Sequence, residues 1–299
     1  MTTAPRVLAS GFRFLEGPRW HAGAVWVSDM HDDKVMAFSE QGELLQVIEV
    51  PGPSGLGWLP DGSLVVAATK ERTIYRHTAS GLQVHADLTG IGIVDHEIND
   101  LWTDDVGRCF VGEFGVHVHE WMHDHIPENL DENSLNQIAT APFPNAAVFV
   151  VEPDGMVAVA AEEMRFPNGA VVTDQNSRFV VAETFGLRMS EFDLADGVLS
   201  NRRIWDIGFA PDGIAEPDAD GNFWVANPLG GSAVLVAPGG QHLATIQAER
   251  GVYACALGGH DGHTLFLCTS TTADPAVSGE MWDARLESVR VETGLARTS

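Results

Sequence analysis

Four oxygen-bearing side chains occupy equivalent places in four related stretches of the sequence. They are Glu16, Asn99, Asn168 and Asp212, which open the stretches EGPRW, NDLWT, NGAVV and DGIAE. Two carboxylates and two carboxamides supply only hard oxygen donors, the ligands that Ca²⁺, Mg²⁺ and Mn²⁺ prefer. Without a cation, gathered carboxylates repel each other and one of them tends to take up a proton. The set therefore predicts a divalent-cation site with these four residues as ligands.

A simpler interpretation applies to each of these residues taken singly. Asn and Asp before Gly are common turn formers, so Asn168 or Asp212 alone would indicate a hairpin turn. Glu16 is different, because Glu is not a turn former and yet holds the same place in its repeat. The prediction of a cation site thus depends on the set of four rather than on any one member.

These stretches belong to a longer repeat that occurs six times. Further copies begin at Ser54 (SGLGWLPDG) and, in degraded form, at Ala254 (ACALGGHDG). Successive copies lie about 40–45 residues apart except for one longer interval, and this spacing is typical of propeller blades of four strands each. Short apolar runs bounded by Asp-Gly, Pro-Gly, Gly-Gly and Asn-Gly pairs agree with short strands joined by tight turns.

The repeats predict an all-β protein, a six-bladed β-propeller of four-stranded blades that forms a single domain over residues 1–299. The alternative, two β-sandwiches, would not predict six copies in phase. Equivalent positions of the blades converge on the axis of a propeller, so we expect the four oxygen donors to converge as well. Gly17, Gly169 and Gly213 follow three of the donors and would let neighbouring backbones come close.

The long interval falls in the third blade and predicts an inserted loop or lid at about 115–147. The segment carries histidines at positions 117, 119, 123 and 125, in an H-x-H pattern that could ligate a metal. Alternation alone fixes no ligand geometry, so a solvated loop is the preferred interpretation of these histidines.

The composition restricts the partners of the protein. The chain has 299 residues and a formal charge of −25, so its surface repels phosphate backbones and no nucleic-acid partner is expected. No stretch approaches the roughly 18 apolar residues of a transmembrane helix, and the N-terminus lacks the pattern of a signal peptide. These features predict a cytoplasmic protein without a membrane partner, and they leave its oligomeric state open. Three cysteines without CxxC spacing predict neither a disulfide framework nor a zinc site.

Four motifs resemble a known family. LEGPRW, INDLWTDDVGRCFVGEFG, FPNGAVVTD and APDGIAEPDADGNFWVA resemble the senescence-marker-protein/regucalcin/gluconolactonase family of six-bladed propellers, in family order and over residues 15–269. The resemblance implies a hydrolase that opens small-molecule lactones with one divalent cation, Ca²⁺ foremost, with Mn²⁺, Mg²⁺ or Zn²⁺ as alternatives. It implies that the cation binds Glu16, Asn168 and Asp212. It further implies that Asn99 is a ligand, direct or through water, that contacts substrate, and that Asp212 is the catalytic acid or base.

The sequence departs from the sugar-lactonase pattern in two places. Glu97 stands two residues before Asn99, where those enzymes often carry an arginine, and a carboxylate cannot donate hydrogen bonds to a sugar as arginine does. The long segment after Gly115 is the second departure. A bulkier or less polar lactone is therefore the predicted substrate. Aromatic side chains that would line its pocket, together with Glu97, are Trp121, Phe185 and Tyr253. Each of these aromatics is also open to interpretation as ordinary packing.

Other functions stay open on the sequence alone. Hydrolysis of organophosphates, as phosphotriesters, would use the same cation and the same ligands. A non-catalytic propeller would bind calcium or a protein partner and catalyse no reaction. A propeller enzyme that catalyses condensations without metal fits less well, because it has no need of four oxygen donors in phase. The sequence has no G-x-S-x-G elbow and no P-loop.

Overall fold

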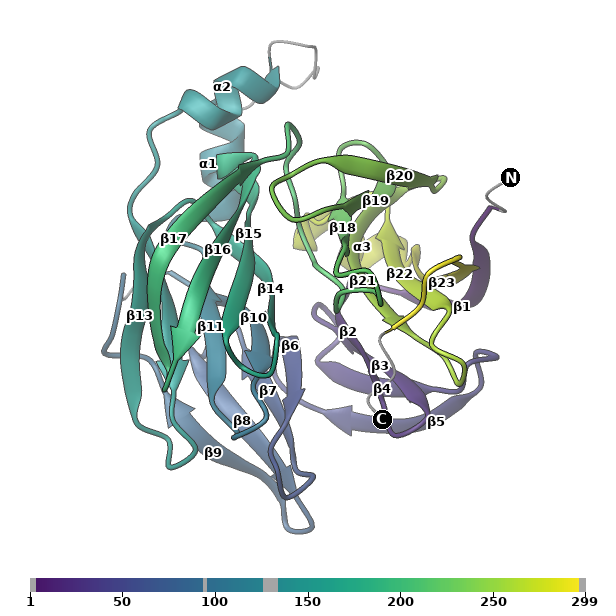
Figure 1. Cartoon of the computed structure of the whole chain (residues 1–299). Coiled ribbons are helices and arrows are strands. Elements are labelled where there is room, and N and C mark those ends of the chain that lie inside the picture. Colours follow the sequence, from purple (N-terminus) through teal and green to yellow (C-terminus); the bar gives the residue numbers. More distant parts are fainter. Residues whose placement is uncertain (1–3, 94–95, 126–133, 296–299) are drawn as a thin grey trace. The chain divides into compact units, whose positions relative to one another are not determined.

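The computed structural model describes residues 4–93, 96–125 and 134–295, and its main elements are six antiparallel sheets (Figure 1). The sheets follow one another along the chain, as the six sequence repeats predict. The chain divides into two compact units, Met1–Leu56 with Asp212–Ser299 and Gly57–Pro211, which are described in turn. Within the described ranges, no helix is long and apolar enough to cross a membrane.

The unit Gly57–Pro211 contains three sheets, each a four-stranded meander in chain order. The first sheet consists of β6 (Pro53–Trp58), which begins just before the unit, β7 (Leu64–Ala68), β8 (Thr73–Thr78) and β9 (Gly81–Asp87). The second consists of β10 (Ile98–Thr103), β11 (Cys109–Glu113), β12 (Ala146–Val151) and β13 (Val157–Met164). The third consists of β14 (Pro167–Thr173), β15 (Arg178–Glu183), β16 (Arg188–Ala195) and β17 (Val198–Asp206).

The unit Met1–Leu56 with Asp212–Ser299 contains the other three sheets. One consists of β2 (Leu15–His21), β3 (Ala24–Asp29), β4 (Lys34–Phe38) and β5 (Leu44–Glu49). A three-stranded sheet consists of β18 (Phe223–Asn227), β19 (Ser232–Val236) and β20 (His242–Gln247). The last consists of β21 (Gly251–Gly258), β22 (Thr264–Ser270), β23 (Ala284–Arg290) and β1 (Arg6–Phe12), with the helix α3 (Pro275–Met281) between β22 and β23.

Two blades of this unit differ from the simple four-stranded repeat. The three-stranded sheet gains a short innermost segment, which pairs with β18 through the Ile214–Val225 bridge and a hydrogen bond from the Asp212 N–H to the Ala226 carbonyl at 3.0 Å. The last sheet is completed by β1, which runs antiparallel to β23 from Arg6 to Phe12. The N-terminal strand therefore closes the final blade, a feature that the sequence repeats do not reveal.

The first strand of several sheets has an irregular register at the residue where the sequence repeat begins. Such irregularities lie between Glu16 and Arg19 of β2, Ile98 and Leu101 of β10, Pro167 and Ala170 of β14, and Val252 and Ala254 of β21. A β-bulge bends its strand and re-aims side chains, and bulges are common beside active sites. The repeat therefore encodes a local distortion of the first strand as well as its hairpin turns.

The hydrophobic core lies between consecutive sheets within each unit. In Gly57–Pro211, Val65 of β7 and Phe149 of β12 belong to one cluster, because the inward faces of their sheets pack together. In the other unit, Val27 of β3 and Phe266 of β22 share a cluster in the same way. The three cysteines are free and buried, and burial raises the pKa of the Cys255 thiol to about 12.

The long connection between β11 and β12 is helical where the structure describes it. It contains α1 (Val118–His125) and α2 (Ser134–Thr140), drawn above the sheets in Figure 1. Trp121 of α1 and Ile138 of α2 are buried in one apolar cluster with Phe166 and Phe185. The sequence predicts a solvated loop here. The segment forms two helices instead, because their apolar side chains pack together in one cluster. The predicted role as a lid stays a prediction, and residues 126–133 lie outside the described residues.

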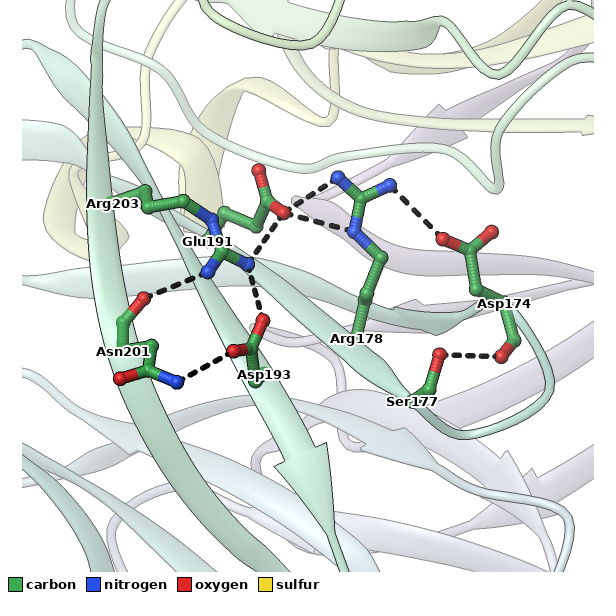
Figure 2. A network of polar contacts seen from close by, with 7 residues as sticks. All are labelled: Asp174, Ser177, Arg178, Glu191, Asp193, Asn201 and Arg203. Carbon is green, nitrogen blue, oxygen red and sulfur yellow. Dashed lines mark hydrogen bonds and ion pairs between the residues drawn. The ribbon is translucent and has the colours of Figure 1, made fainter.

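A ladder of charged side chains crosses β15, β16 and β17 (Figure 2). Glu191 accepts hydrogen bonds from Arg178 at 2.8 Å and from Arg203 at 2.7 Å, and Arg203 also pairs with Asp193 at 2.7 Å. Arg178 reaches Asp174 in the turn before β15 at 2.9 Å. A network of this kind ties neighbouring strands together more effectively than an isolated surface pair. It stabilises the sheet that carries the turn η1 (Thr184–Gly186) at its opposite end.

Candidate functional site

The two carboxylates of the predicted site lie in the same unit, and both interact electrostatically with one tyrosine. Glu16 lies on β2, and Asp212 lies on the short segment that pairs with β18. Tyr253 lies on β21, which contacts both β2 and β18. Burial raises the pKa of the Tyr253 phenol, and the negative charges of Asp212, Glu16 and Asp283 raise it further. The phenol therefore keeps its proton at neutral pH and remains a hydrogen-bond donor beside two carboxylates.

The Tyr253 ring is held in place by its surroundings. The Tyr253 backbone carbonyl accepts a hydrogen bond from the Gly213 N–H at 2.9 Å, and this bond fixes β21 against the residue that follows Asp212. Its ring meets Phe14 edge to face with centroids 4.9 Å apart, and Phe14 in turn stacks on His31. Packing and the backbone hydrogen bond thus fix the position of the tyrosine.

The two carboxamides of the predicted site lie together in the other unit, on β10 and β14, which contact each other. Asn99 donates a hydrogen bond from Nδ2 to the Pro167 carbonyl at 3.5 Å. Asn168 donates from Nδ2 to Thr184 Oγ1 at 3.1 Å, and the Thr184 hydroxyl donates to the Pro211 carbonyl at 2.7 Å. Both asparagines are buried, with 7% and 8% of their surface exposed.

These hydrogen bonds determine which way each carboxamide faces. A carbonyl oxygen can only accept, so Asn99 must turn its NH₂ group toward Pro167. The single hydroxyl proton of Thr184 is engaged by Pro211, so Thr184 can only accept from Asn168, which must also turn its NH₂ group inward. Each Oδ1 atom therefore faces away from these protein acceptors and is available to a cation or a substrate.

Two of the predicted glycines are required for the close approach of neighbouring strands. A Cβ atom on Gly17, whose φ is +55°, would lie 2.5 Å from the Ser54 carbonyl oxygen at the start of β6. A Cβ atom on Gly213 would lie 2.7 Å from the Ala254 Cα atom of β21. The glycines that follow Glu16 and Asp212 thus let the backbone approach as the sequence predicts.

A buried ion pair that the sequence does not reveal contacts backbone groups shortly before Glu97 and Asn99. Arg72 pairs with Glu113 at 3.5 Å, and their side chains are only 5% and 1% exposed. Arg72 also donates to the backbone carbonyls of Leu88, Ile91 and His96, and Glu113 accepts from the Ile93 N–H at 3.0 Å. Burial lowers the pKa of Arg72 and raises that of Glu113, which marks the cost of desolvating both charges.

The predicted substrate-lining residues fall into separate groups. Trp121 and Phe185 pack on each other with ring centroids 4.3 Å apart, and Trp121 Nε1 donates to the Pro142 carbonyl at 3.0 Å. Both are at least 93% buried, so their contacts here are those of core residues. Glu97 is half-buried just before β10, and its carbonyl accepts from the Phe114 N–H at 2.9 Å. Tyr253 lies in the other unit, beside the two carboxylates.

The structure thus places two of the predicted ligands in each unit. Glu16 and Asp212 belong to one unit, and Asn99 and Asn168 to the other. Convergence of all four on one cation stays a prediction. In the described part of the chain, no group of three or more His, Cys, Asp or Glu side chains is arranged to hold a metal.

Solved structures of similar fold match almost the whole chain. A luciferin-regenerating enzyme, 15% identical, aligns with a TM-score of 0.78 over 99% of this chain and 98% of that chain. The calcium-binding protein regucalcin from Agrobacterium tumefaciens, 17% identical, aligns with a TM-score of 0.75 over 98% of this chain and 95% of that chain. A gluconolactonase from Xanthomonas campestris, 20% identical, aligns with a TM-score of 0.69 over 96% of this chain and 95% of that chain.

These likenesses concern the fold, and they confirm the six-bladed β-propeller predicted from the repeats. The sequence itself matches a family over residues 14–271, described as the SMP-30/gluconolactonase/LRE-like region. That stretch includes all four oxygen donors and their repeats. The chain therefore belongs to the SMP-30/gluconolactonase/LRE-like family.

Proposed function

We propose that the protein is a divalent-cation-dependent hydrolase that opens the ring of a lactone. The observation that carries this proposal is the orientation of the two buried carboxamides, whose Oδ1 atoms are turned away from protein acceptors. Membership of a family that includes gluconolactonases supports ester chemistry, and the calcium-binding relative of similar fold supports Ca²⁺ as the cation. A lactone is a cyclic ester, which a site of this type can polarise and hydrolyse.

The donor set fits a hard divalent cation. Glu16 and Asp212 supply two negative charges, which balance a 2+ ion, and Asn99 and Asn168 add neutral oxygen atoms without excess charge. All four are oxygen donors, which suit Ca²⁺, Mg²⁺ and Mn²⁺ alike. The calcium-binding relative favours Ca²⁺ among them, and Zn²⁺ is a further alternative. Bound there, the cation would polarise the lactone carbonyl and stabilise the negative charge that develops on its oxygen.

The residues of the chain have distinct tasks in this proposal. Asp212 accepts a proton from the attacking water and returns it to the leaving alkoxide oxygen, so that ring opening leaves a carboxylic acid and an alcohol. Asn99 contacts the substrate while its NH₂ group stays bound to Pro167. Tyr253, which keeps its proton, is placed to donate a hydrogen bond to a substrate oxygen beside Asp212.

The experiment that tests the proposal is proton release from a panel of sugar, aliphatic and aromatic lactones. The protein is stripped of metal with a chelator and then reloaded with Ca²⁺, Mn²⁺, Mg²⁺ or Zn²⁺. We expect turnover to disappear on stripping and to return on reloading, because the cation supplies the stabilisation of the oxyanion. Turnover that survives complete removal of metal, or that no cation restores, would contradict the proposal.

Glu97 is expected to set the preference against sugar lactones. Glu97→Arg should raise the ratio of kcat/KM for glucono-1,5-lactone to kcat/KM for an aliphatic lactone by about 10–100-fold, because one charged hydrogen bond contributes ~1.5–3 kcal/mol. Glu97→Gln is the matched variant, since it removes the charge without adding the donor fork of arginine. Steady-state kinetics on the two lactones measure the ratio. An unchanged ratio in the arginine variant would show that Glu97 does not contact the substrate.

One other function, cation binding without catalysis, has specific support, and organophosphate hydrolysis is tested beside it. The relative named as a calcium-binding protein favours a non-catalytic cation-binding role as the second candidate, and this role predicts tight cation binding without turnover of any lactone. Organophosphate hydrolysis would use the same oxygen donors, so phosphotriesters belong on the same panel. A preference for phosphotriesters over every lactone would favour that activity.

A further inference from the structure

The Thr184 hydroxyl occupies an unusual position between two of the predicted cation ligands. It accepts a hydrogen bond from Asn168 Nδ2 at 3.1 Å and donates one to the Pro211 carbonyl at 2.7 Å. The peptide bond of Pro211 leads directly into Asp212. One hydroxyl group is therefore linked to the carboxamide of one ligand and to the peptide that precedes another.

The turn that carries Thr184 is fixed by a buried carboxylate. Glu183, which the structure buries completely, accepts from the Arg165 N–H at 2.8 Å, from Arg188 Nη2 at 2.8 Å and from Arg202 Nη2 at 2.6 Å. Burial by itself would raise the pKa of Glu183, but Arg188 and Arg202 hold this pKa below its usual value, so the carboxylate stays ionised. Thr184 then donates its own N–H to the Phe166 carbonyl at 3.1 Å, which ties the turn to the start of β14.

These contacts leave Thr184 little freedom. Its backbone is anchored by Glu183 on one side and by Phe166 on the other, and its hydroxyl proton is directed to Pro211. A fixed acceptor at this point gives Asn168 a single favourable orientation, with Nδ2 toward Thr184 and Oδ1 away. Groups that orient metal ligands in this way affect affinity although they never touch the metal.

We propose that Thr184 is a positioning residue of the cation site, which orients Asn168 Oδ1 and tethers the peptide leading to Asp212. This inference rests on the proposed function, because it assumes that Asn168 and Asp212 bind a cation. It goes beyond that function by assigning a role to a side chain that shares no place in the sequence repeat with the four donors. The role belongs to the hydroxyl group alone, so the shape of the side chain should matter little.

The test compares cation binding by metal-free variants. Thr184→Val keeps the shape and removes the hydroxyl, and we expect the Kd for Ca²⁺, measured by calorimetry, to rise about 10–100-fold. Thr184→Ser keeps both hydrogen bonds and should bind Ca²⁺ nearly as wild type does. The matched control is Thr73→Val on β8, because Thr73 is buried and its hydroxyl also donates to a carbonyl, that of Glu71 at 3.0 Å. This control should leave the Kd unchanged while losing a similar hydrogen bond.

Each outcome has a definite meaning. Weak binding by Thr184→Val, rescue in Thr184→Ser and normal binding by Thr73→Val is the expected result. Wild-type affinity in Thr184→Val, or an equal loss in Thr73→Val, would overturn the positioning role while leaving the cation site in place. Absence of Ca²⁺, Mn²⁺, Mg²⁺ and Zn²⁺ binding by the wild-type protein would overturn the proposed function, and this inference with it.

Discussion

Replacing Asp212 with alanine is expected to lower kcat/KM for lactone opening by about 10²–10⁴-fold, the usual contribution of a general base. Asp212 is only 8% exposed, and its N–H is held by the Ala226 carbonyl at 3.0 Å. The backbone hydrogen bond survives the substitution, so the fold should persist while the base and one anionic donor are lost. The measurement is the initial rate of proton release at saturating cation, together with thermal unfolding of the metal-free protein.

Asp212→Asn is the matched variant for this experiment. Its carboxamide keeps an oxygen donor for the cation but cannot take a proton from water at neutral pH. We expect it to bind Ca²⁺ more weakly than wild type, and to turn over lactone almost as slowly as Asp212→Ala even when the cation is saturating. Turnover near the wild-type level in Asp212→Asn would contradict the role of Asp212 as the base.

Arg72→Met is expected to lower the free energy of unfolding by about 3–5 kcal/mol, because it leaves the Glu113 carboxylate buried without its charged partner. The methionine keeps much of the apolar stem of arginine, so the loss reports the guanidinium group rather than a large cavity. The variant also loses the donors that Arg72 offers to the carbonyls of Leu88 and Ile91. Denaturant unfolding followed by tryptophan fluorescence measures the change.

The control for Arg72 is the more exposed ion pair between Arg76 and Asp61, whose side chains are 33% and 52% exposed. Arg76→Met should cost no more than about 1 kcal/mol, because water and salt screen such a pair. The double variant with Glu113→Gln should recover part of the loss, since the buried charge is then gone. Equal losses for Arg72→Met and Arg76→Met would contradict a special role for the buried pair.

The sheets could be predicted from the sequence because each blade is a local unit. Its strands are consecutive in the chain, and its turns are marked in the sequence by residue pairs that contain glycine, beside short apolar runs. Closure of the last blade by β1 could not be predicted in this way, because β1 and β23 lie at opposite ends of the chain and β1 carries no copy of the repeat. The helices α1 and α2 are too short to show a clear helical period, so their segment was expected to be a loop.

The sequence predicts the oxygen donors of the candidate site, but it does not predict the residues that hold those donors in place. The four donors share a place in the repeat: Glu16, Asn99, Asn168 and Asp212. For the first three of them, this place is also where the first strand of the sheet has an irregular register. Thr184 could not be found from the repeat, because its importance comes from two hydrogen bonds to distant residues. Arg72 and Glu113 look like surface charges in the sequence, and only packing shows that both are buried.

Cation-dependent lactone hydrolysis is tested most directly by a titration of metal-free protein with Ca²⁺ in which binding and lactone turnover are followed on the same sample. We expect turnover to be absent at the start, to rise with the same midpoint as calorimetric binding, and to saturate at one cation per chain. The lactone is the best substrate of the panel, so that weak activity is not mistaken for none. Full turnover before any Ca²⁺ is added, or saturating cation binding with no turnover, would contradict a cation-dependent lactonase.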